Sequence, residues 1–128
     1  MVRHTDDGLW GTIGGSVELD EAPEDAAIRE TSEEAGVTVA LLGIRAVLGG
    51  PRFRMHYPNG DEVAYVSIVF EARVVDGAPR PDGDETSEVA WFSATELATL
   101  PMNDVTRAVI DGAHVTDWAA PANEQRTS

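Results

Sequence analysis

Residues 15–37 read GSVELDEAPEDAAIRETSEEAGV and carry the clearest structural signal in the chain. Pro23 suits the first turn of a helix, and the acidic pair that follows it favours the positive N-terminal end of the helix dipole. Gly36 is placed to end the helix as a left-handed residue. The pattern therefore predicts a helix from about Pro23 to Ala35, entered through a glycine turn.

Three glutamates of this helix, Glu30, Glu33 and Glu34, stand at i, i+3 and i+4, which places their carboxylates on one face. Each close pair of like charges costs on the order of 1 kcal/mol at partial exposure, so we expect a cation beside them. Hard divalent cations such as Mg²⁺ take carboxylate and phosphate oxygens as ligands. Arg29 is placed to pair with Glu33 and to hold its orientation. The other interpretation is an ordinary solvated helix face.

The whole pattern is more specific than its Glu-Glu pair. It resembles the Nudix box, the signature of hydrolases that cut nucleoside diphosphates linked to another group. The resemblance covers nearly the whole chain and implies an α/β fold, namely an α/β/α sandwich with a mixed β-sheet. The matching positions are Gly15, Glu21, Arg29-Glu30, Glu33-Glu34 and Gly36.

The resemblance also implies roles for single residues. In the family, the Glu-Glu pair binds metal, usually with the backbone carbonyl of a flanking glycine, and these positions are Glu33, Glu34 and Gly14 here. Glu30 corresponds to a glutamate that binds metal or assists the attacking water. Glu21 corresponds to one that supports the loop or contacts the metal indirectly. The implied cofactor is Mg²⁺, with Mn²⁺ as a substitute.

Two positions depart from the family pattern. Thr31 stands where a large aliphatic residue usually packs the helix onto the sheet, which predicts weaker packing there. The family also favours Trp-x-x-Pro-Gly-Gly before the box, whereas residues 10–15 read WGTIGG. Without the proline the turn loses a preset dihedral angle, but both glycines remain.

The composition predicts a cytoplasmic protein with one domain. The 128 residues, 42% of them apolar, are enough for one core, which we place in residues 1–118, followed by a loose tail at 119–128. Nine basic against 23 acidic residues give a net charge of −14, which disfavours binding to polymeric nucleic acid or an anionic membrane. The absence of cysteine excludes disulfides and makes a zinc site a poor fit. The expected partner is a small nucleotide.

Beyond the box, the pattern predicts strands and one more helical region. Asn59-Gly60 is a strong hairpin signal. The strand after it carries apolar residues on both faces, which predicts a central strand covered from both sides. Ser93 begins a Ser-x-x-Glu capping box. The predicted strands are 37–48, 52–57 and 61–75, and a last helix is predicted from about Asn103 to Asp111.

Arg52, Arg54 and His56 fall on one side of the predicted strand 52–57. Arginine grips phosphate with a planar fork, so Arg52 and Arg54 are candidates for binding the substrate. The other interpretation of this row is a solvated strand face. Trp10, just before the box, is expected to pack against it, with base stacking as the alternative.

A second acidic cluster, Asp82 to Glu88, precedes Trp91-Phe92. Many Nudix hydrolases bring a glutamate from such a late loop to the metal, as a ligand or as the general base. Glu85 resembles that residue best, and Glu88 is second; a turn-rich acidic surface loop is the alternative. Asn103, after the last loop, lies where some relatives place the base and is a further candidate contact to the substrate.

Fewer residues precede the Nudix box in this sequence than the family's fold normally has. Nudix domains normally open with a strand or two before the Trp-Gly turn, and residues 1–9 precede Trp10 here. Val2-Arg3-His4 has the pattern of the end of such a strand. We therefore expect either a longer native N-terminus or a sheet without its first N-terminal strand. In the second case another chain could pair with the open edge, as in a homodimer.

The predicted function is Mg²⁺-dependent hydrolysis of a diphosphate bond in a nucleoside diphosphate linked to another moiety. A metal lowers the pKa of a bound water, and a glutamate accepts its proton as the water attacks phosphorus. One alternative is a Nudix-type module that senses a nucleotide without turnover. Another, weaker because no EF-hand pattern is present, is a Ca²⁺-binding acidic domain. Substrate candidates are ADP-ribose, dinucleoside polyphosphates and nucleoside triphosphates, oxidised ones included.

Overall fold

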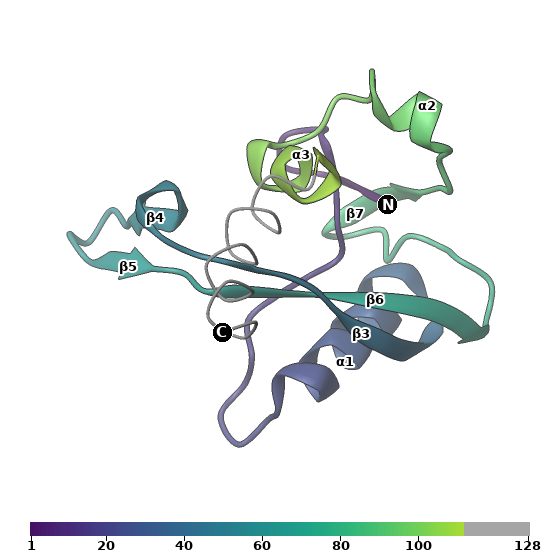
Figure 1. Cartoon of the computed structure of the whole chain (residues 1–128), viewed down its shortest axis with the longest axis horizontal. Coiled ribbons are helices and arrows are strands. Elements are labelled where there is room, and N and C mark those ends of the chain that lie inside the picture. Colours follow the sequence, from purple (N-terminus) through teal and green to yellow (C-terminus); the bar gives the residue numbers. More distant parts are fainter. Residues whose placement is uncertain (112–128) are drawn as a thin grey trace, which may run out of the picture.

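The computed structural model describes residues 1–111 (Figure 1). The predicted tail, 119–128, and the end of the predicted domain, 112–118, lie outside the described residues. The described strands form three small antiparallel sheets, and an isolated parallel bridge joins Trp10 to Met102. In these sheets β1 (Val2–His4) lies between β2 (Trp10–Gly11) and β7 (Thr86–Val89), β3 (Thr38–Leu48) pairs with β6 (Ser67–Asp76), and β4 (Arg54–His56) pairs with β5 (Glu62–Ala64).

The predicted helix is present at its predicted bounds, as α1 (Pro23–Ala35). Gly36 follows in the left-handed conformation, with φ at 70°, and its N–H donates to the carbonyl of Ser32 at 3.0 Å. The N–H of Arg80 donates to the carbonyl of Ala35 at 2.8 Å. The loop after β6 therefore satisfies part of the last turn of α1, which a helix end cannot do by itself.

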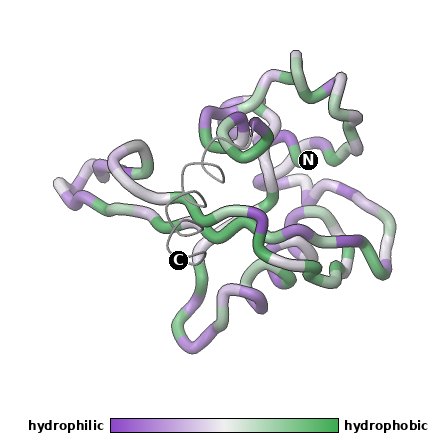
Figure 2. Tube along the Cα trace, in the orientation of Figure 1, coloured by the Kyte–Doolittle hydropathy of each residue, from purple (hydrophilic) through white to green (hydrophobic). Residues whose placement is uncertain are grey.

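Two apolar clusters hold the layers together. The first joins the end of α1 to β1 and β3, and the second lies at the other end of β3, where α3 (Asp104–Asp111) packs. α1 and α3 thus lie on either side of the β3–β6 ribbon, along which Figure 2 shows a concentration of hydrophobic residues. This arrangement confirms the predicted α/β class. The buried members are Val2, Ala35, Val37 and Val39 in the first cluster, and Ala46, Leu48, Phe53 and Val109 in the second.

Two strand predictions are wrong in detail. The predicted strand 52–57 is shorter, because Pro51 opens a 3₁₀ turn, η1 (Pro51–Phe53), and β4 begins only at Arg54. The predicted strand 61–75 is interrupted between β5 and β6, where the N–H of Tyr65 donates to the carbonyl of Phe53 at 2.9 Å. Within residues 1–111, β6 pairs only with β3, and Val66 before it is 73% exposed. In this part of the chain β6 is therefore an edge strand, and not the central strand that its apolar pattern predicts.

β1 is not the open edge that the sequence predicts at the start of the sheet. Arg3 pairs with Trp10 of β2 on one side and with Glu88 of β7 on the other. Two short strands from later in the chain therefore cover both edges of β1. The edge of β6 away from β3 is one of the strand edges that stay unpaired among residues 1–111.

The predictions for the last described helices are confirmed. α2 (Ala94–Leu97) begins with the predicted capping box between Ser93 and Glu96, and α3 begins one residue after its predicted start. Trp10 is 8% exposed and meets the ring of Phe92 edge-on, with the ring centroids 4.9 Å apart. It therefore packs beside the segment after β7, and its expected packing against the box stays a prediction. No helix among residues 1–111 is long and apolar enough to cross a membrane.

Candidate active site

Glu34 is the one buried carboxylate among residues 1–111, with 4% of the residue exposed. It lies near the end of α1, and its Oε2 accepts a hydrogen bond from the N–H of Gly14 at 3.2 Å. Burial raises the pKa of Glu34 to about 7, and the charges of Glu30, Glu85 and Asp82 act in the same direction. A carboxylate in this position is stabilised in its charged form by a cation.

The carboxylate of Glu30 lies against the backbone of Gly15. A Cβ at position 15 would overlap the carboxyl group of Glu30, so any larger residue here would force that carboxyl group to move. The glycine turn therefore meets α1 at two successive residues, Gly14 at Glu34 and Gly15 at Glu30. This contact places the backbone of the turn beside two carboxylates of the predicted metal site.

Arg29 organises the outer side of this region. Its Nε and Nη2 donate to the two carboxylate oxygens of Glu21 at 2.8 and 3.0 Å. Its Nη1 donates to Glu30 at 3.0 Å and to Glu33 at 3.2 Å. The hydrogen bond from Arg29 lowers the pKa of Glu21 to about 2, and the N–H of Glu18 also contributes. The forked pair with Glu21 ties the loop before α1 to the helix, and Arg29 orients both other glutamates.

The late acidic loop meets α1 through Thr86. Its Oγ1 donates to the carbonyl of Glu34 at 3.1 Å, and Thr86 itself is fully buried. The carboxylate of Asp82 accepts hydrogen bonds from the N–H groups of Asp84 and Thr86 at 2.8 and 2.9 Å. On the other side of the loop, the N–H of Thr5 donates to the carbonyl of Glu85 at 3.0 Å. Glu85 is thereby held close enough to Glu34 for its charge to affect the pKa of that carboxyl.

Several predicted site residues lie elsewhere or take other partners. Glu88 pairs with Arg3 at 2.9 Å, on the sheet and not beside Glu34. The side chain of Glu33 is 58% exposed, and its carboxylate binds Arg29. Asn103 caps α3, since its Oδ1 accepts from the N–H of Thr106 at 2.8 Å. The roles predicted for Glu33 and Asn103 therefore stay predictions.

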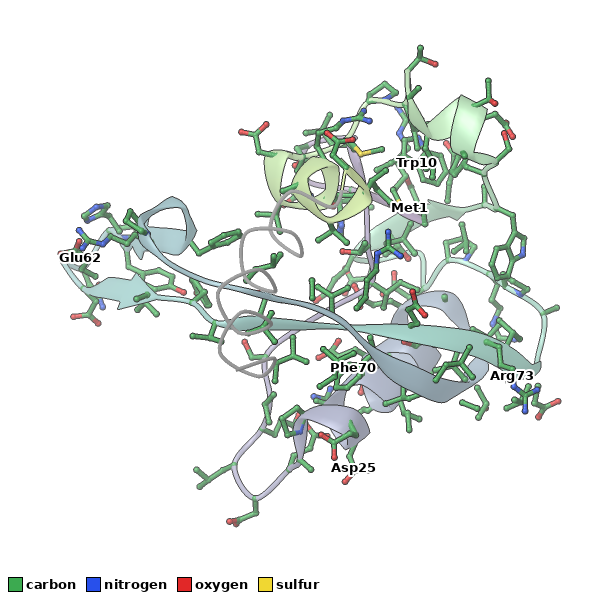
Figure 3. The ribbon with its side chains drawn as sticks, in the orientation of Figure 1. Met1, Trp10, Asp25, Glu62, Phe70 and Arg73 are labelled. Atoms are coloured by element: carbon green, nitrogen blue, oxygen red, sulfur yellow. The ribbon has the colours of Figure 1, made fainter. Side chains whose placement is uncertain are left out.

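The predicted cationic row lies on the β4–β5 hairpin, away from the first turn of α1 (Figure 3). Arg54 and His56 are both within reach of Glu62, at 3.5 and 3.8 Å. Figure 3 shows Glu62 at the end of the β4–β5 hairpin, well away from Asp25 of α1. The side chain of Arg52 is not among those that the structure describes. The arrangement of Arg54 and His56 matches the solvated strand face that the sequence left open.

Asp82 and Thr86 are the residues that the sequence did not single out. Asp82 belongs to a recognised acidic run, and its carboxylate accepts hydrogen bonds from within the loop. The signal that could have found this role is an Asp followed four residues later by a Thr, in a loop rich in turn residues. No local pattern shows that Thr86 also reaches α1, because Glu34 is 52 residues away.

The donor chemistry of the region fits a hard divalent cation. Carboxylates of Glu30, Glu34 and Glu85 and the backbone of Gly14 offer oxygen ligands, which suit Mg²⁺ or Mn²⁺. As the side chains are placed, no three His, Cys, Asp or Glu residues among residues 1–111 form a group that could hold a metal. One physical reason is that Arg29 draws the carboxylates of Glu30 and Glu33 to itself.

Comparison with known proteins identifies relatives over most of the chain. A Mycobacterium tuberculosis protein named "Putative 8-oxo-dGTP diphosphatase 3" is 32% identical over 97 residues, which are 75% of this chain and 42% of that protein. The NAD-capped RNA hydrolase NudC of Pseudomonas aeruginosa is 32% identical over 105 residues, 81% of this chain and 34% of that protein. The chain thus spans less than half the length of these two relatives.

A similar fold is found among solved structures. The crystal structure of a MutT NUDIX hydrolase from Burkholderia pseudomallei superposes with a TM-score of 0.70 at 26% identity, covering 86% of this chain and 83% of that one. A family model for the NUDIX domain matches residues 1–113. That match includes the glycine turn, all of α1 and the late acidic loop, and on this ground the chain belongs to the Nudix family.

Proposed function

We propose that this chain is a Mg²⁺-dependent pyrophosphohydrolase that cuts a diphosphate bond in a nucleoside diphosphate linked to another moiety. The observation that carries the proposal is Glu34, a buried carboxylate beside the backbone of Gly14 and within the field of three further carboxylates. Burying a carboxylate costs free energy unless its charge is compensated. A purely structural site would therefore gain little from a buried Glu34. A divalent cation with a diphosphate compensates it.

Residues of this chain have distinct parts in the proposed reaction. When bound, Mg²⁺ supplies charge neutralisation for the diphosphate and acidifies a water. Glu30, Glu33 and Glu34, with the backbone of Gly14, would hold it, and Glu85 is a further ligand or the general base. Arg29 orients Glu30 and Glu33 from its forked pair with Glu21. Arg52, Arg54 and Asn103 stay candidate substrate contacts.

The proposed substrate is a small nucleotide. The two named relatives point in different directions, since one name refers to 8-oxo-dGTP and the other to NAD-capped RNA. The net charge of −14 opposes approach of a long polyanion, whereas a mononucleotide meets mainly the local field of the metal. A nucleoside triphosphate or a nucleoside diphosphate-X compound is therefore favoured over capped RNA.

Product release from a nucleotide panel, with and without Mg²⁺, tests the proposal. Wild type is compared with Glu34→Gln and with Glu24→Gln, which removes an exposed carboxylate from the first turn of the same helix. We expect Mg²⁺-dependent turnover that Glu34→Gln lowers by several orders of magnitude and Glu24→Gln leaves nearly unchanged. Nucleotide binding without turnover on any member would favour the sensor, and full activity in a folded Glu34→Gln would refute the metal site.

A homodimer through β6 is also proposed. The edge of β6 away from β3 pairs with no strand among residues 1–111, and exposed strand edges invite pairing. Glu71 and Arg73 are exposed two residues apart, so antiparallel pairing of two copies of β6 about Ala72 sets Glu71 opposite Arg73 of the partner copy. Figure 3 shows Arg73 near the end of β6, on the side of the molecule opposite Glu62.

Light scattering tests this dimer and its register. We expect wild type to run as a dimer, Glu71→Arg to dissociate through like charges, and Glu71→Arg combined with Arg73→Glu to restore association. A monomeric wild type at all concentrations, or a double variant that stays as dissociated as the single one, would contradict this arrangement.

A further inference from the structure

Thr86 is buried without exposed surface, and each of its polar side-chain functions has a partner. Its Oγ1 donates to the carbonyl of Glu34 at 3.1 Å and accepts from the N–H of Asp82 at 3.0 Å. Its backbone N–H donates to Oδ1 of Asp82 at 2.9 Å. One hydroxyl group therefore bonds both α1, at the buried glutamate, and the late acidic loop.

Two threonine side chains hold the loop between Asp82 and Thr86 against the rest of the protein. Its inner side is held by Thr86, and its outer side by Thr5, whose Oγ1 donates to the carbonyl of Asp84 at 2.7 Å. Hydrogen bonds from Thr86 and Asp84 to its carboxylate lower the pKa of Asp82, so the turn is formed around a charged Asp82 at neutral pH. Glu85 lies between these anchors, directly before Thr86 in the sequence, and its carbonyl accepts from the N–H of Thr5 at 3.0 Å.

A side chain with the shape of Thr86 but without its hydroxyl would not replace it. Valine has nearly the volume of threonine, but it would leave the carbonyl of Glu34 without its partner in a buried contact, and it would remove the acceptor of the N–H of Asp82. Serine keeps the hydroxyl and loses one methyl group. The two substitutions therefore separate the hydrogen bonds from the packing.

We propose that Thr86 is a positioning residue that sets the separation between Glu34 and Glu85, and through it the affinity of the protein for a divalent cation. This role rests on the proposed function, in which both glutamates face the metal. Thr86 itself contacts neither metal nor substrate. Residues that orient metal ligands in this way change metal affinity by about 10- to 100-fold when they are lost.

Mn²⁺ binding by calorimetry, with thermal unfolding in chelator, tests this role on the full chain. Thr86→Val should weaken Mn²⁺ binding by about 10-fold or more, whereas Thr86→Ser should stay within about 3-fold of wild type. The matched control is Thr31→Val, because the hydroxyl of Thr31 also donates to a carbonyl of α1, that of Ala27 at 2.7 Å, but binds no residue of the late loop. Thr31→Val should keep wild-type affinity.

The Mg²⁺ dependence of nucleotide hydrolysis provides the second readout. Thr86→Val should need about 10-fold more Mg²⁺ for half-maximal rate and regain part of its rate at saturating Mg²⁺. A purely structural role would lower the unfolding temperature and leave the Mg²⁺ requirement unchanged. If Thr86→Val does not fold, Thr5→Val removes the side-chain part of the outer anchor and should shift both readouts in the same direction but less, because the backbone N–H of Thr5 still donates to the carbonyl of Glu85.

These measurements distinguish a failure of the positioning role from a failure of the proposed function. Suppose that the wild type binds Mn²⁺ and hydrolyses nucleotide. Unchanged Mn²⁺ affinity in folded Thr86→Val, or in Thr5→Val where Thr86→Val does not fold, then overturns the positioning role and leaves the proposed function standing. If the wild type binds Mn²⁺ but does not hydrolyse nucleotide, the Mn²⁺ affinities of the variants still test the positioning role. A wild type that does neither overturns the proposed function and this role together.

Discussion

The carboxylate of Glu34 accepts a hydrogen bond from the backbone N–H of Gly14 at 3.2 Å, although the two residues are 20 positions apart. This contact brings the glycine turn to the C-terminal part of α1. It also leaves a charge-bearing group buried next to other acidic groups. The stability of the metal-free protein and its activity are therefore expected to oppose each other at this residue.

Glu34→Gln is expected to stabilise the metal-free protein at pH 8 while it abolishes turnover. Glutamine retains an oxygen that can accept from Gly14, but it removes a buried charge and its repulsion with Glu30. We expect a gain on the order of 1 to 3 kcal/mol in the free energy of unfolding, measured by urea denaturation in chelator. Adding Mg²⁺ should stabilise wild type and not the variant. A variant less stable than wild type in chelator would speak against a strained, cation-requiring carboxylate.

Glu21→Gln is expected to change how stability depends on acid. The pKa of Glu21 is about 2 in the folded protein, below its ordinary value of 4.5, because Arg29 stabilises the carboxylate. Its contribution to stability is thus fully present above pH 4.5 and is lost as the pH falls from 4.5 towards 2.

Urea midpoints at pH 7, 4 and 3 measure this effect. Relative to wild type, Glu21→Gln should be less stable at pH 7, and the difference should shrink as the pH falls. Glu62→Gln is the control, because its pair with Arg54, at 3.5 Å, joins two exposed side chains. Parallel pH profiles for wild type and Glu21→Gln would show that the forked pair is not what lowers the pKa.

Gly15→Ala is expected to reduce hydrolysis by about 10- to 100-fold in a folded protein, because the new Cβ displaces the carboxylate of Glu30. Gly43→Ala is the control, since a Cβ there meets no atom within 4 Å. Steady-state rates with saturating Mg²⁺ and circular dichroism measure both variants. Wild-type rates in Gly15→Ala would mean that the position of Glu30 against the turn has no part in the reaction.

Arg29→Lys is expected to lower turnover by about 10-fold although it keeps the charge, since an ammonium group cannot make the forked contact to Glu21 while it also holds Glu30 and Glu33. Arg45→Lys is the matched control, because Arg45 makes a single exposed contact to Glu71 at 3.3 Å. The ratio of turnover rates in the two variants is the measurement. Equal, small losses of turnover in both variants would mean that Arg29 supplies only a positive charge.

Local patterns were enough for the elements whose signals are local. The bounds of α1 followed from Pro23 and Gly36, and the start of α2 followed from Ser93 and Glu96, since caps act within one helical turn. Strand positions were less well predicted. Residues 52–57 alternate like a strand, but Pro51 turns the chain first, and no local signal marks the break at Tyr65, which bonds to Phe53.

The helix with its acidic face, the glycine turn before it and the family to which both point could be predicted without the structure, because these features depend on spacing along one short segment. Only the tertiary structure decided which carboxylate is buried and what surrounds it. Glu34 meets Gly14 and Thr86 through contacts across 20 and 52 residues, and Glu88, close to Glu85 in sequence, is drawn away to Arg3. Burial and long-range pairing arise from how distant segments pack, and spacing along the chain does not encode them locally.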